Sequence, residues 1–189
     1  MEEKTLIEKL KSNDENSFRI LVDLFKKKVF NTSLSIIQNI DDADDISQDV
    51  FIQIFKSINK FKGNSSLSTW IYKITISKSF EYIRYKKRKK RFSTLLKLFR
   101  EDGSIIDIPD FVHPGILLER KEDSKLLFEA IEKLNQYQKQ AYILKNITGL
   151  SYNEIADVMD KTTSSIESLI FRAKRNLKKE LIKKMDNKK

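Results

Sequence analysis

Residues 151–181 read SYNEIADVMDKTTSSIESLIFRAKRNLKKEL, and this stretch decides the fold class of the chain. Ser151 and Glu154 have the S-x-x-E spacing of a capping box, so a helix is expected to begin here. After the polar turn at 160–162 a second helix is predicted, because apolar residues recur at spacings of four, three and four. These residues are Ile166, Ile170, Ala173 and Leu177. Two short helices joined by a tight turn, the second ending in basic residues, are typical of a helix-turn-helix.

Glycine and proline divide the rest of the sequence. Two of each gather in REDGSIIDIPDFVHPG, residues 100–115, where they disfavour helix and admit turns. The blocks on either side show helical spacing of apolar residues and no alternation of period two. We therefore expect an all-α protein with two small helical domains, residues 1–95 and 120–186, joined by a flexible linker, residues 96–119.

Three further helices are predicted in the N-terminal block. The first has the apolar stripe Phe18, Leu21, Phe25 and Val29. The second is expected to begin at Asp41, a good N-cap, and to turn an apolar face inward. That face consists of Ile46, Val50, Ile54 and Phe55. The third is expected to run from about Trp70 into the basic sequence RYKKRKKR, residues 84–91.

The composition narrows the classes of function. Of 189 residues, 37 are lysine or arginine and 27 are aspartate or glutamate, a formal net charge of +10 that favours a polyanionic partner such as nucleic acid. The absence of cysteine excludes disulfides, thiolate nucleophiles and thiolate-bound zinc, and the single histidine, His113, stands beside Pro114. No catalytic residue, metal or cofactor is expected. No apolar run approaches the roughly 18 residues that span a bilayer, and the acidic start does not resemble a secretory signal.

One segment is strongly acidic although the chain as a whole is basic. Residues 41–51 read DDADDISQDVF, with five aspartates in nine residues. In a helix Asp42, Asp45 and Asp49 share one face, and Gln48 lies beside them. A calcium-binding EF-hand loop would need a glycine at its sixth position, but Ile46 belongs to an apolar helical stripe instead. The residues alone therefore leave a solvated acidic face or a docking surface, and they weigh against a metal site or an acid–base catalyst.

Taken in order, these motifs resemble the extracytoplasmic-function (ECF) sigma factors, small bacterial initiation factors that carry sigma domains two and four. The family's D-A-E-D-L/I-x-Q-E/D-x-F core of domain two is matched by residues 42–51, and its F-x-G-x-S-x-F-x-T-W-L pattern by residues 61–71. Domain four's L-S-Y-x-E-I-A is matched by residues 150–156, and its R-A-R/K-x-x-L by residues 172–177. The resemblance extends from about Leu6 to Leu181.

The resemblance implies a cytoplasmic protein without catalysis of its own, which binds core RNA polymerase and directs promoter recognition and transcription initiation. The acidic face would bind the basic coiled coil of the polymerase β′ clamp, through Asp42, Asp45, Gln48 and Asp49. The groove of domain four would receive the β flap. An anti-sigma factor is an expectation from the family alone, and no stable membrane insertion is expected.

The resemblance also implies two surfaces that bind promoter DNA. The loop from Phe61 would capture a base flipped from the minus-ten element, and the basic helix end would contact phosphates. The residues expected there are Phe61, Asn64, Ser65, Ser66, Lys73, Ser77, Arg84, Lys87 and Arg88, whereas Trp70 is expected to be mainly structural. The start of the last helix and its arginines would meet the minus-thirty-five duplex. The residues expected there are Thr163, Ser164, Ser165, Ser168, Arg172 and Arg175.

Several positions depart from the family pattern. Ser77 stands where the family usually has asparagine, Glu81 replaces a common aspartate, and Glu167 and Leu169 stand where lysine or arginine is frequent. The resemblance therefore leaves the promoter bases open. Two other functions remain as alternatives: a helix-turn-helix regulator that acts without docking on core polymerase, and a small carboxylate enzyme.

Overall fold

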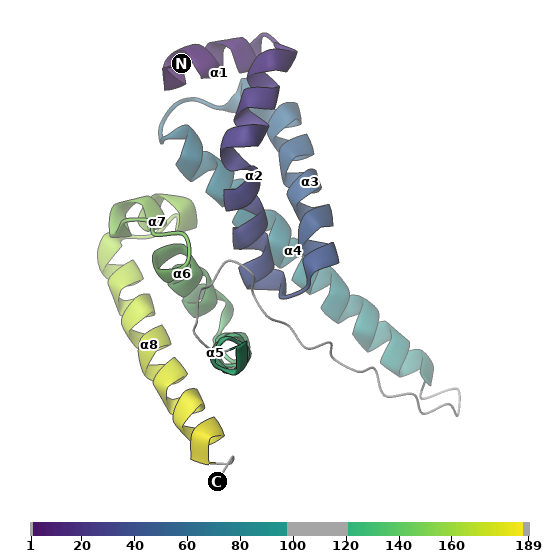
Figure 1. Cartoon of the computed structure of the whole chain (residues 1–189), viewed down its shortest axis with the longest axis vertical. Coiled ribbons are helices and arrows are strands. Elements are labelled where there is room, and N and C mark those ends of the chain that lie inside the picture. The colour runs from purple at the N-terminus through teal and green to yellow at the C-terminus, as the bar shows by residue number, and fades with distance from the viewer. Residues whose placement is uncertain (1, 98–120, 187–189) are drawn as a thin grey trace.

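The computed structural model describes residues 2–97 and 121–186, so most of the predicted linker lies outside the described residues. Every regular element within these ranges is a helix, which confirms the predicted all-α class. Figure 1 shows two groups of helices that lie side by side, the N-terminal block in purple to teal and the C-terminal block in green to yellow.

The N-terminal block contains four α-helices and one short 3-10 helix. They are α1 (Glu3–Lys11), α2 (Glu15–Ile37), α3 (Ile40–Ser57), η1 (Ile58–Lys60) and α4 (Leu67–Lys97). The C-terminal block contains four α-helices. They are α5 (Lys121–Glu132), α6 (Gln136–Asn146), α7 (Tyr152–Met159) and α8 (Thr163–Asp186). The predicted helix-turn-helix is therefore α7 and α8, and the turn between them is 160–162.

Two of the predicted helix starts need correction. Helix α3 begins at Ile40 and its N-cap is Asn39, not Asp41, because the Asn39 side-chain oxygen accepts the backbone N–H of Asp42 at 2.9 Å. Asp41 instead lies in the first turn, where a carboxylate interacts favourably with the helix dipole. Helix α4 begins at Leu67, three residues before Trp70.

The capping box that starts α7 is present as predicted. The backbone N–H of Glu154 donates to the Ser151 hydroxyl at 3.2 Å, and the Glu154 carboxylate accepts the backbone N–H of Ser151 at 2.8 Å. These reciprocal bonds satisfy two backbone donors that a helix start would otherwise leave unpaired. The side-chain and backbone hydrogen bonds from Ser151 lower the pKa of the Glu154 carboxyl below its ordinary value.

Replacing Ser151 with alanine is expected to lower the free energy of unfolding by about 1 kcal/mol, the usual cost of losing an N-cap. A lowered pKa in the folded state means that the Glu154 contribution is present above the ordinary carboxyl pKa and fades as pH falls through the lowered value. Urea denaturation of both proteins at neutral and acidic pH measures this, and the difference between them should shrink at acidic pH. An equal difference at both values would show that Glu154 takes no part.

The core of the N-terminal block is built by one face each of α1 to α4. Leu21, Ile54, Ile58, Leu67 and Ile71 are each at most 2% exposed. Phe55, which the pattern predicted to face inward, is 50% exposed. Its ring packs edge to face on that of Phe18, with the ring centroids 5.3 Å apart, at the outer rim between α2 and α3.

The core of the C-terminal block extends into the N-terminal block. Four apolar side chains from α2 and α4 belong to the same buried cluster as the apolar faces of α5 to α8. They are Ile36, Tyr72, Ile76 and Phe80, each at most 6% exposed. Helix α4 packs against α7, and α2 packs against α6. We call this contact between the two blocks the interdomain seam.

Candidate functional site

The outer face of α3 carries exposed acidic side chains. The helix is oriented by Ala43, Ile46 and Val50, which are buried against the neighbouring helices. Asp45 and Asp49 therefore lie on the solvent side, and both are exposed. Gln48 is also exposed, and its side-chain amide donates to the carboxylate of Asp44 at 3.0 Å.

Asp42, the fourth residue predicted to bind polymerase, has a different environment. Its side chain is only 20% exposed, and its carboxylate forms an ion pair with the Lys86 ammonium of α4. Burial acts to lower the pKa of Lys86, but hydrogen bonding with Asp42 and Tyr82 outweighs burial and raises that pKa. Asp42 therefore joins α3 to α4, and it is less available to a partner than Asp45 or Asp49.

Apolar side chains continue the exposed face of α3 beyond the acidic residues. Ile52, one turn after Gln48, is 50% exposed, as is Phe55 in the next turn. Sequence reasoning missed Ile52 as a surface residue, although it stands seven residues after Asp45 and so lies on the same face. The face thus combines carboxylates at one end with apolar surface at the other.

No group of three or more histidine, cysteine, aspartate or glutamate side chains that could hold a metal ion occurs within residues 2–97 and 121–186. In the same part of the chain, none of the helices is both long and apolar enough to cross a membrane.

A second surface is a line of side chains along α4. Spacings of three and four residues bring them onto one side of the helix. They are Trp70, Lys73, Ser77, Glu81, Arg84 and Arg88. All except the half-buried Trp70 are exposed, and Lys87 is exposed beside the line. The Ser77 hydroxyl donates to the Glu81 carboxylate at 3.0 Å, which holds one negative charge among the cations.

Two adjoining clefts follow this line where α4 faces α3. One, of about 510 Å³, is lined by Trp70, Lys73, Ser77 and Glu81, among others. The other, of about 450 Å³, is lined by Glu81, Arg84 and Arg88, together with Asp49 of α3. Five of the residues predicted to bind promoter DNA or polymerase therefore meet in one grooved surface: Lys73, Ser77, Arg84, Arg88 and Asp49.

The loop before α4 differs from its prediction at Phe61. Its ring was expected to offer a stacking surface, but Phe61 is only 4% exposed and belongs to the core of the N-terminal block. It packs against Trp70, with the ring centroids 5.1 Å apart. Trp70 is the aromatic residue that lines the cleft beside Asn64 and Ser65. The prediction for Phe61 as a stacking surface is therefore wrong, whereas Trp70, half-buried against the same core, has the structural environment that was expected and also lines the cleft.

Ser66 has a structural position at the start of α4. Its hydroxyl accepts the backbone N–H of Thr69 at 3.1 Å, as an N-cap does. The backbone N–H of Leu67 donates to the Glu3 carboxylate of α1 at 3.1 Å. Asn64 is exposed and Ser65 half-buried, so these two side chains are the polar groups that the loop presents to the cleft.

The solvent face of α8 carries part of the predicted minus-thirty-five set. Ser164, Ser168, Arg172 and Arg175 are exposed, opposite the buried stripe that the sequence predicted. Phe171 lies among them and is 68% exposed. Sequence reasoning missed it because only polar side chains were considered, although its spacing from Ser168 and Arg175 puts it on their side of the helix.

Two other members of that set, Thr163 and Ser165, lie in the first turn of α8 and are half-buried. The Thr163 hydroxyl donates to the Asn153 side chain of α7 at 3.1 Å. The backbone N–H of Ser165 donates to the Thr162 hydroxyl at 3.2 Å, so Thr162 caps α8. The first bond joins the start of α8 to α7, and the second caps α8.

Two models of known families match separate parts of the chain. Residues 21–89 match the model of Sigma-70 region 2, and residues 124–177 match the model of Sigma-70 region 4. The chain is 28% identical over 176 residues to the ECF RNA polymerase sigma-E factor of Haemophilus influenzae, an alignment that covers 91% of both chains. The relative of the same name in Escherichia coli is also 28% identical, over 91% of this chain and 90% of that one. The chain belongs to the ECF sigma factors.

Two solved structures have the fold of this ECF sigma factor. CnrH, in complex with the cytosolic domain of CnrY, is 20% identical with a TM-score of 0.67, over 95% of this chain and 96% of CnrH. The sigma factor RpoE of Bartonella quintana, in complex with the anti-sigma factor NepR, is 22% identical with a TM-score of 0.65, over 87% of this chain and 96% of RpoE.

The two domains of the sigma factor also share a cleft. It has a volume of about 640 Å³, and it lies between the loop before α4 and the turn between α7 and α8. Asn64, Ser65 and Trp70 line it from domain two, and Lys161 and Thr162 line it from domain four. Residues predicted to bind minus-ten DNA thus lie next to the helix-turn-helix.

Proposed function

We propose that this ECF sigma factor docks on core RNA polymerase through the exposed face of α3 and contacts promoter DNA through the α4 line and α8. The observation that carries the proposal is the separation of charge within domain two. Carboxylates gather on α3 and cations on α4, although the chain as a whole is strongly basic. Two partners of opposite charge, a basic protein surface and DNA, account for both.

Polymerase docking is assigned to Asp45, Gln48 and Asp49. Their exposure permits charge-assisted hydrogen bonds to arginines of the β′ clamp coiled coil, which give orientation as well as attraction. Ile52 and Phe55 extend this face with apolar surface that becomes buried on docking. Asp42 supports the face from within by its ion pair with Lys86.

The minus-ten element is assigned to the loop before α4 and to the α4 line. Asn64 and Ser65 supply hydrogen bonds to the edges of a flipped base, and the half-buried ring of Trp70 supplies a stacking surface. Lys73, Ser77, Arg84, Lys87 and Arg88 follow, and the cations among them bind phosphates with an affinity that falls as salt rises. Phe61 and Ser66 act indirectly, by holding Trp70 and the start of α4.

The minus-thirty-five element is assigned to the exposed face of α8. Ser164, Ser168, Arg172 and Arg175 are suited to phosphates and to guanine edges. The exposed ring of Phe171 suits the methyl group of thymine in the major groove. Thr163 and Ser165 support this face from the first turn of α8, through the bonds to Asn153 and Thr162.

The remaining partners follow from the family. The groove of domain four is proposed to receive the β flap. An anti-sigma factor is proposed because the related RpoE was solved with one. The sigma factors are a family of non-enzymatic transcription factors, and we propose that this chain likewise has no catalysis of its own and acts in the cytoplasm.

Transcription in vitro tests the proposal. Purified core polymerase, this protein and DNA from upstream of its own operon should yield a transcript whose start depends on the protein. The absence of such a start on several upstream templates would overturn the proposal. Specific binding to duplex DNA without core, combined with no core binding, would support the helix-turn-helix regulator instead.

Glu81 gives a prediction about base preference. An ionised carboxylate only accepts hydrogen bonds, and in the major groove it suits the cytosine amino group, whereas glutamine pairs with adenine. Replacing Glu81 with glutamine should therefore shift the base preferred opposite this residue from cytosine to adenine, by about fivefold in transcript yield, since one hydrogen bond is worth about 1 kcal/mol. Transcription from templates randomised across the minus-ten element measures the shift. Identical preferences in both proteins would show that Glu81 does not contact a base.

A further inference from the structure

The loop that carries Asn64 and Ser65 is held at its two ends. Phe61 at its start and Leu67 at its end are buried in the core of domain two, where they are 4% and 1% exposed. All the residues between them are exposed except Ser65, which is half-buried. Within the described part of the chain, residues 62–66 form hydrogen bonds only among themselves and with the first turn of α4. The position of the loop therefore depends on how firmly its two ends are fixed.

Helix α1 contacts both of these ends. Its buried side chains Leu6 and Leu10 belong to the same core cluster as Phe61 and Leu67. It also packs against η1, the 3-10 helix directly before the loop. Figure 1 shows α1 lying across the end of domain two where the loop leads from α3 to α4. Helix α1 precedes residue 21, where the match to Sigma-70 region 2 begins, so that match assigns it no role.

One hydrogen bond ties the end of the loop to α1. The backbone N–H of Leu67 donates to the Glu3 carboxylate at 3.1 Å, across 64 positions of the sequence. Leu67 is the first residue of α4, and the first N–H groups of a helix have no partner within that helix. Because Leu67 is only 1% exposed, water has little access to its N–H. Glu3 thus supplies a partner that neither the helix nor the solvent provides.

Glu3 and Ser66 act differently on the start of α4. The Ser66 hydroxyl accepts the backbone N–H of Thr69, and the Ser66 carbonyl accepts that of Trp70, so Ser66 acts within the first turn. Glu3 acts from another helix, and its negative charge at the N-terminal end of α4 also interacts favourably with the helix dipole. Glu3 therefore fixes where this turn lies relative to the rest of domain two, whereas Ser66 fixes the geometry inside the turn.

We propose that Glu3 is a positioning residue for base capture in the minus-ten element, and that it acts without contact to DNA. By holding Leu67 on α1, it fixes the end of the loop and so places Asn64, Ser65 and Trp70 around the flipped base. The inference rests on the proposed capture of that base by the loop. A loop whose end is released adopts the competent position for only part of the time, and its apparent affinity for the base falls by that fraction.

Two replacements of Glu3 separate the hydrogen bond from the charge. Glu3→Ala removes the acceptor, so the N–H of Leu67 gains a partner in water only if the end of the loop moves. Promoter opening at saturating sigma factor should fall about fivefold, the effect of one hydrogen bond, while core affinity stays unchanged. Glu3→Gln keeps an acceptor oxygen and should restore most of the opening. A loss in Glu3→Gln as large as in Glu3→Ala would overturn the role of the hydrogen bond.

Two control variants separate positioning from charge and from stability. Glu2→Ala removes the same charge from the preceding residue, whose side chain makes no capping hydrogen bond, and should leave opening unchanged. Ser66→Ala also loses one bond at the start of α4, so it should lower the free energy of unfolding by an amount similar to Glu3→Ala. It keeps Leu67 bound to α1, and its opening should stay near that of the wild type. Permanganate reactivity of the minus-ten thymines measures opening, and urea denaturation measures stability.

The free protein supplies a readout that needs no DNA. Trp70 is the only tryptophan in the chain, so tryptophan fluorescence reports on the start of α4. Its ring is half-buried and packs against Phe61, with the ring centroids 5.1 Å apart. Release of Leu67 in Glu3→Ala should expose this ring, shift its emission to the red and make it more readily quenched by acrylamide. Glu3→Gln should keep the emission and quenching of the wild type.

The outcomes keep this inference apart from the proposed function. Unchanged opening in Glu3→Ala, where replacing Asn64 and Ser65 with alanine does impair opening, would overturn the inference and leave the proposed function standing. Equal losses of opening in Glu3→Ala and Ser66→Ala, or unchanged Trp70 fluorescence in Glu3→Ala, would overturn it as well. If neither Glu3→Ala nor the loop variant impairs opening while Trp70 fluorescence still responds, base capture by the loop fails, and only the anchoring of the loop by Glu3 survives.

Discussion

Reversing Asp45 and Asp49 to lysine is expected to weaken binding to core RNA polymerase by about 100-fold or more and to leave the free energy of unfolding nearly unchanged. Both side chains are exposed on α3, on the side away from its buried residues. The substitutions therefore remove no core contact, but they oppose cations to the basic β′ coiled coil. Loss of a charge pair at an interface commonly costs about 2–5 kcal/mol, and juxtaposed like charges add to this.

The control is a double reversal with the same change in net charge. Glu8→Lys and Asp23→Lys lie on α1 and α2, are exposed, and are not part of the α3 face. Fluorescence anisotropy with labelled sigma factor measures core affinity, and urea denaturation measures stability. If both pairs of reversals weaken binding equally, the effect is one of net charge. Unchanged affinity of the Asp45 and Asp49 variant would refute docking through α3.

Asp42 was also predicted to bind polymerase, but its contacts within the protein make it a poorer test of docking than Asp45 and Asp49. Helical spacing put Asp42, Asp45 and Asp49 on one face, but spacing within a helix does not reveal which neighbour another helix brings. The ion pair with Lys86 joins residues 44 positions apart. A reversal at Asp42 would break a contact between α3 and α4, so a loss of binding there would not distinguish docking from altered folding.

Local patterns predicted the helical class and the helix-turn-helix, because caps and apolar periodicity act within a few residues. The Ser151 capping box and the buried stripe of α8 are examples, and both are present. The N-cap of α3 was wrong by two residues for an equally local reason, since Asn39 and Asp41 are both good N-caps.

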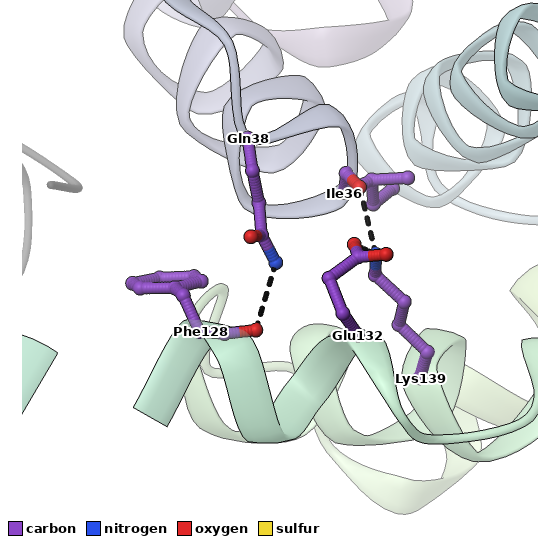
Figure 2. Close-up of polar contacts among 5 residues, drawn as sticks. All are labelled: Ile36, Gln38, Phe128, Glu132 and Lys139. Carbon is purple, nitrogen blue, oxygen red and sulfur yellow. Dashed lines mark hydrogen bonds and ion pairs between the residues drawn. The ribbon is translucent and has the colours of Figure 1, made fainter. Parts of the chain in front are cut away.

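The seam between the domains could not be predicted in this way. Two hydrogen bonds cross it, from the Gln38 amide to the Phe128 carbonyl and from the Lys139 ammonium to the Ile36 carbonyl (Figure 2), and they join residues 90 and 103 positions apart. The sequence Gln138-Lys139-Gln140 is polar and would be expected to face solvent, yet all three residues are at most 8% exposed. The environment of a long polar side chain depends on which acceptors lie nearby, here a carbonyl at the end of α2.

Replacing Asn64 and Ser65 with alanine is expected to reduce promoter opening by about 10- to 100-fold and to change core affinity by less than twofold. These side chains line the cleft in front of Trp70, and each hydrogen bond to an unstacked base edge is worth about 1 kcal/mol or more. Base flipping costs a few kcal/mol, so loss of two bonds leaves the flipped base poorly held. Permanganate reactivity of thymines in the minus-ten element measures opening.

Ser66 must be left out of this variant and used as its control. Its hydroxyl caps α4 through the N–H of Thr69, so Ser66→Ala should lower the free energy of unfolding by about 1 kcal/mol while opening at saturating sigma factor stays near that of the wild type. If the Asn64 and Ser65 variant loses core affinity and opening to the same extent, it is misfolded. If it is stable, binds core normally and opens the promoter as well as the wild type, the loop does not capture the base, and Trp70 with the α4 line would have to account for melting alone.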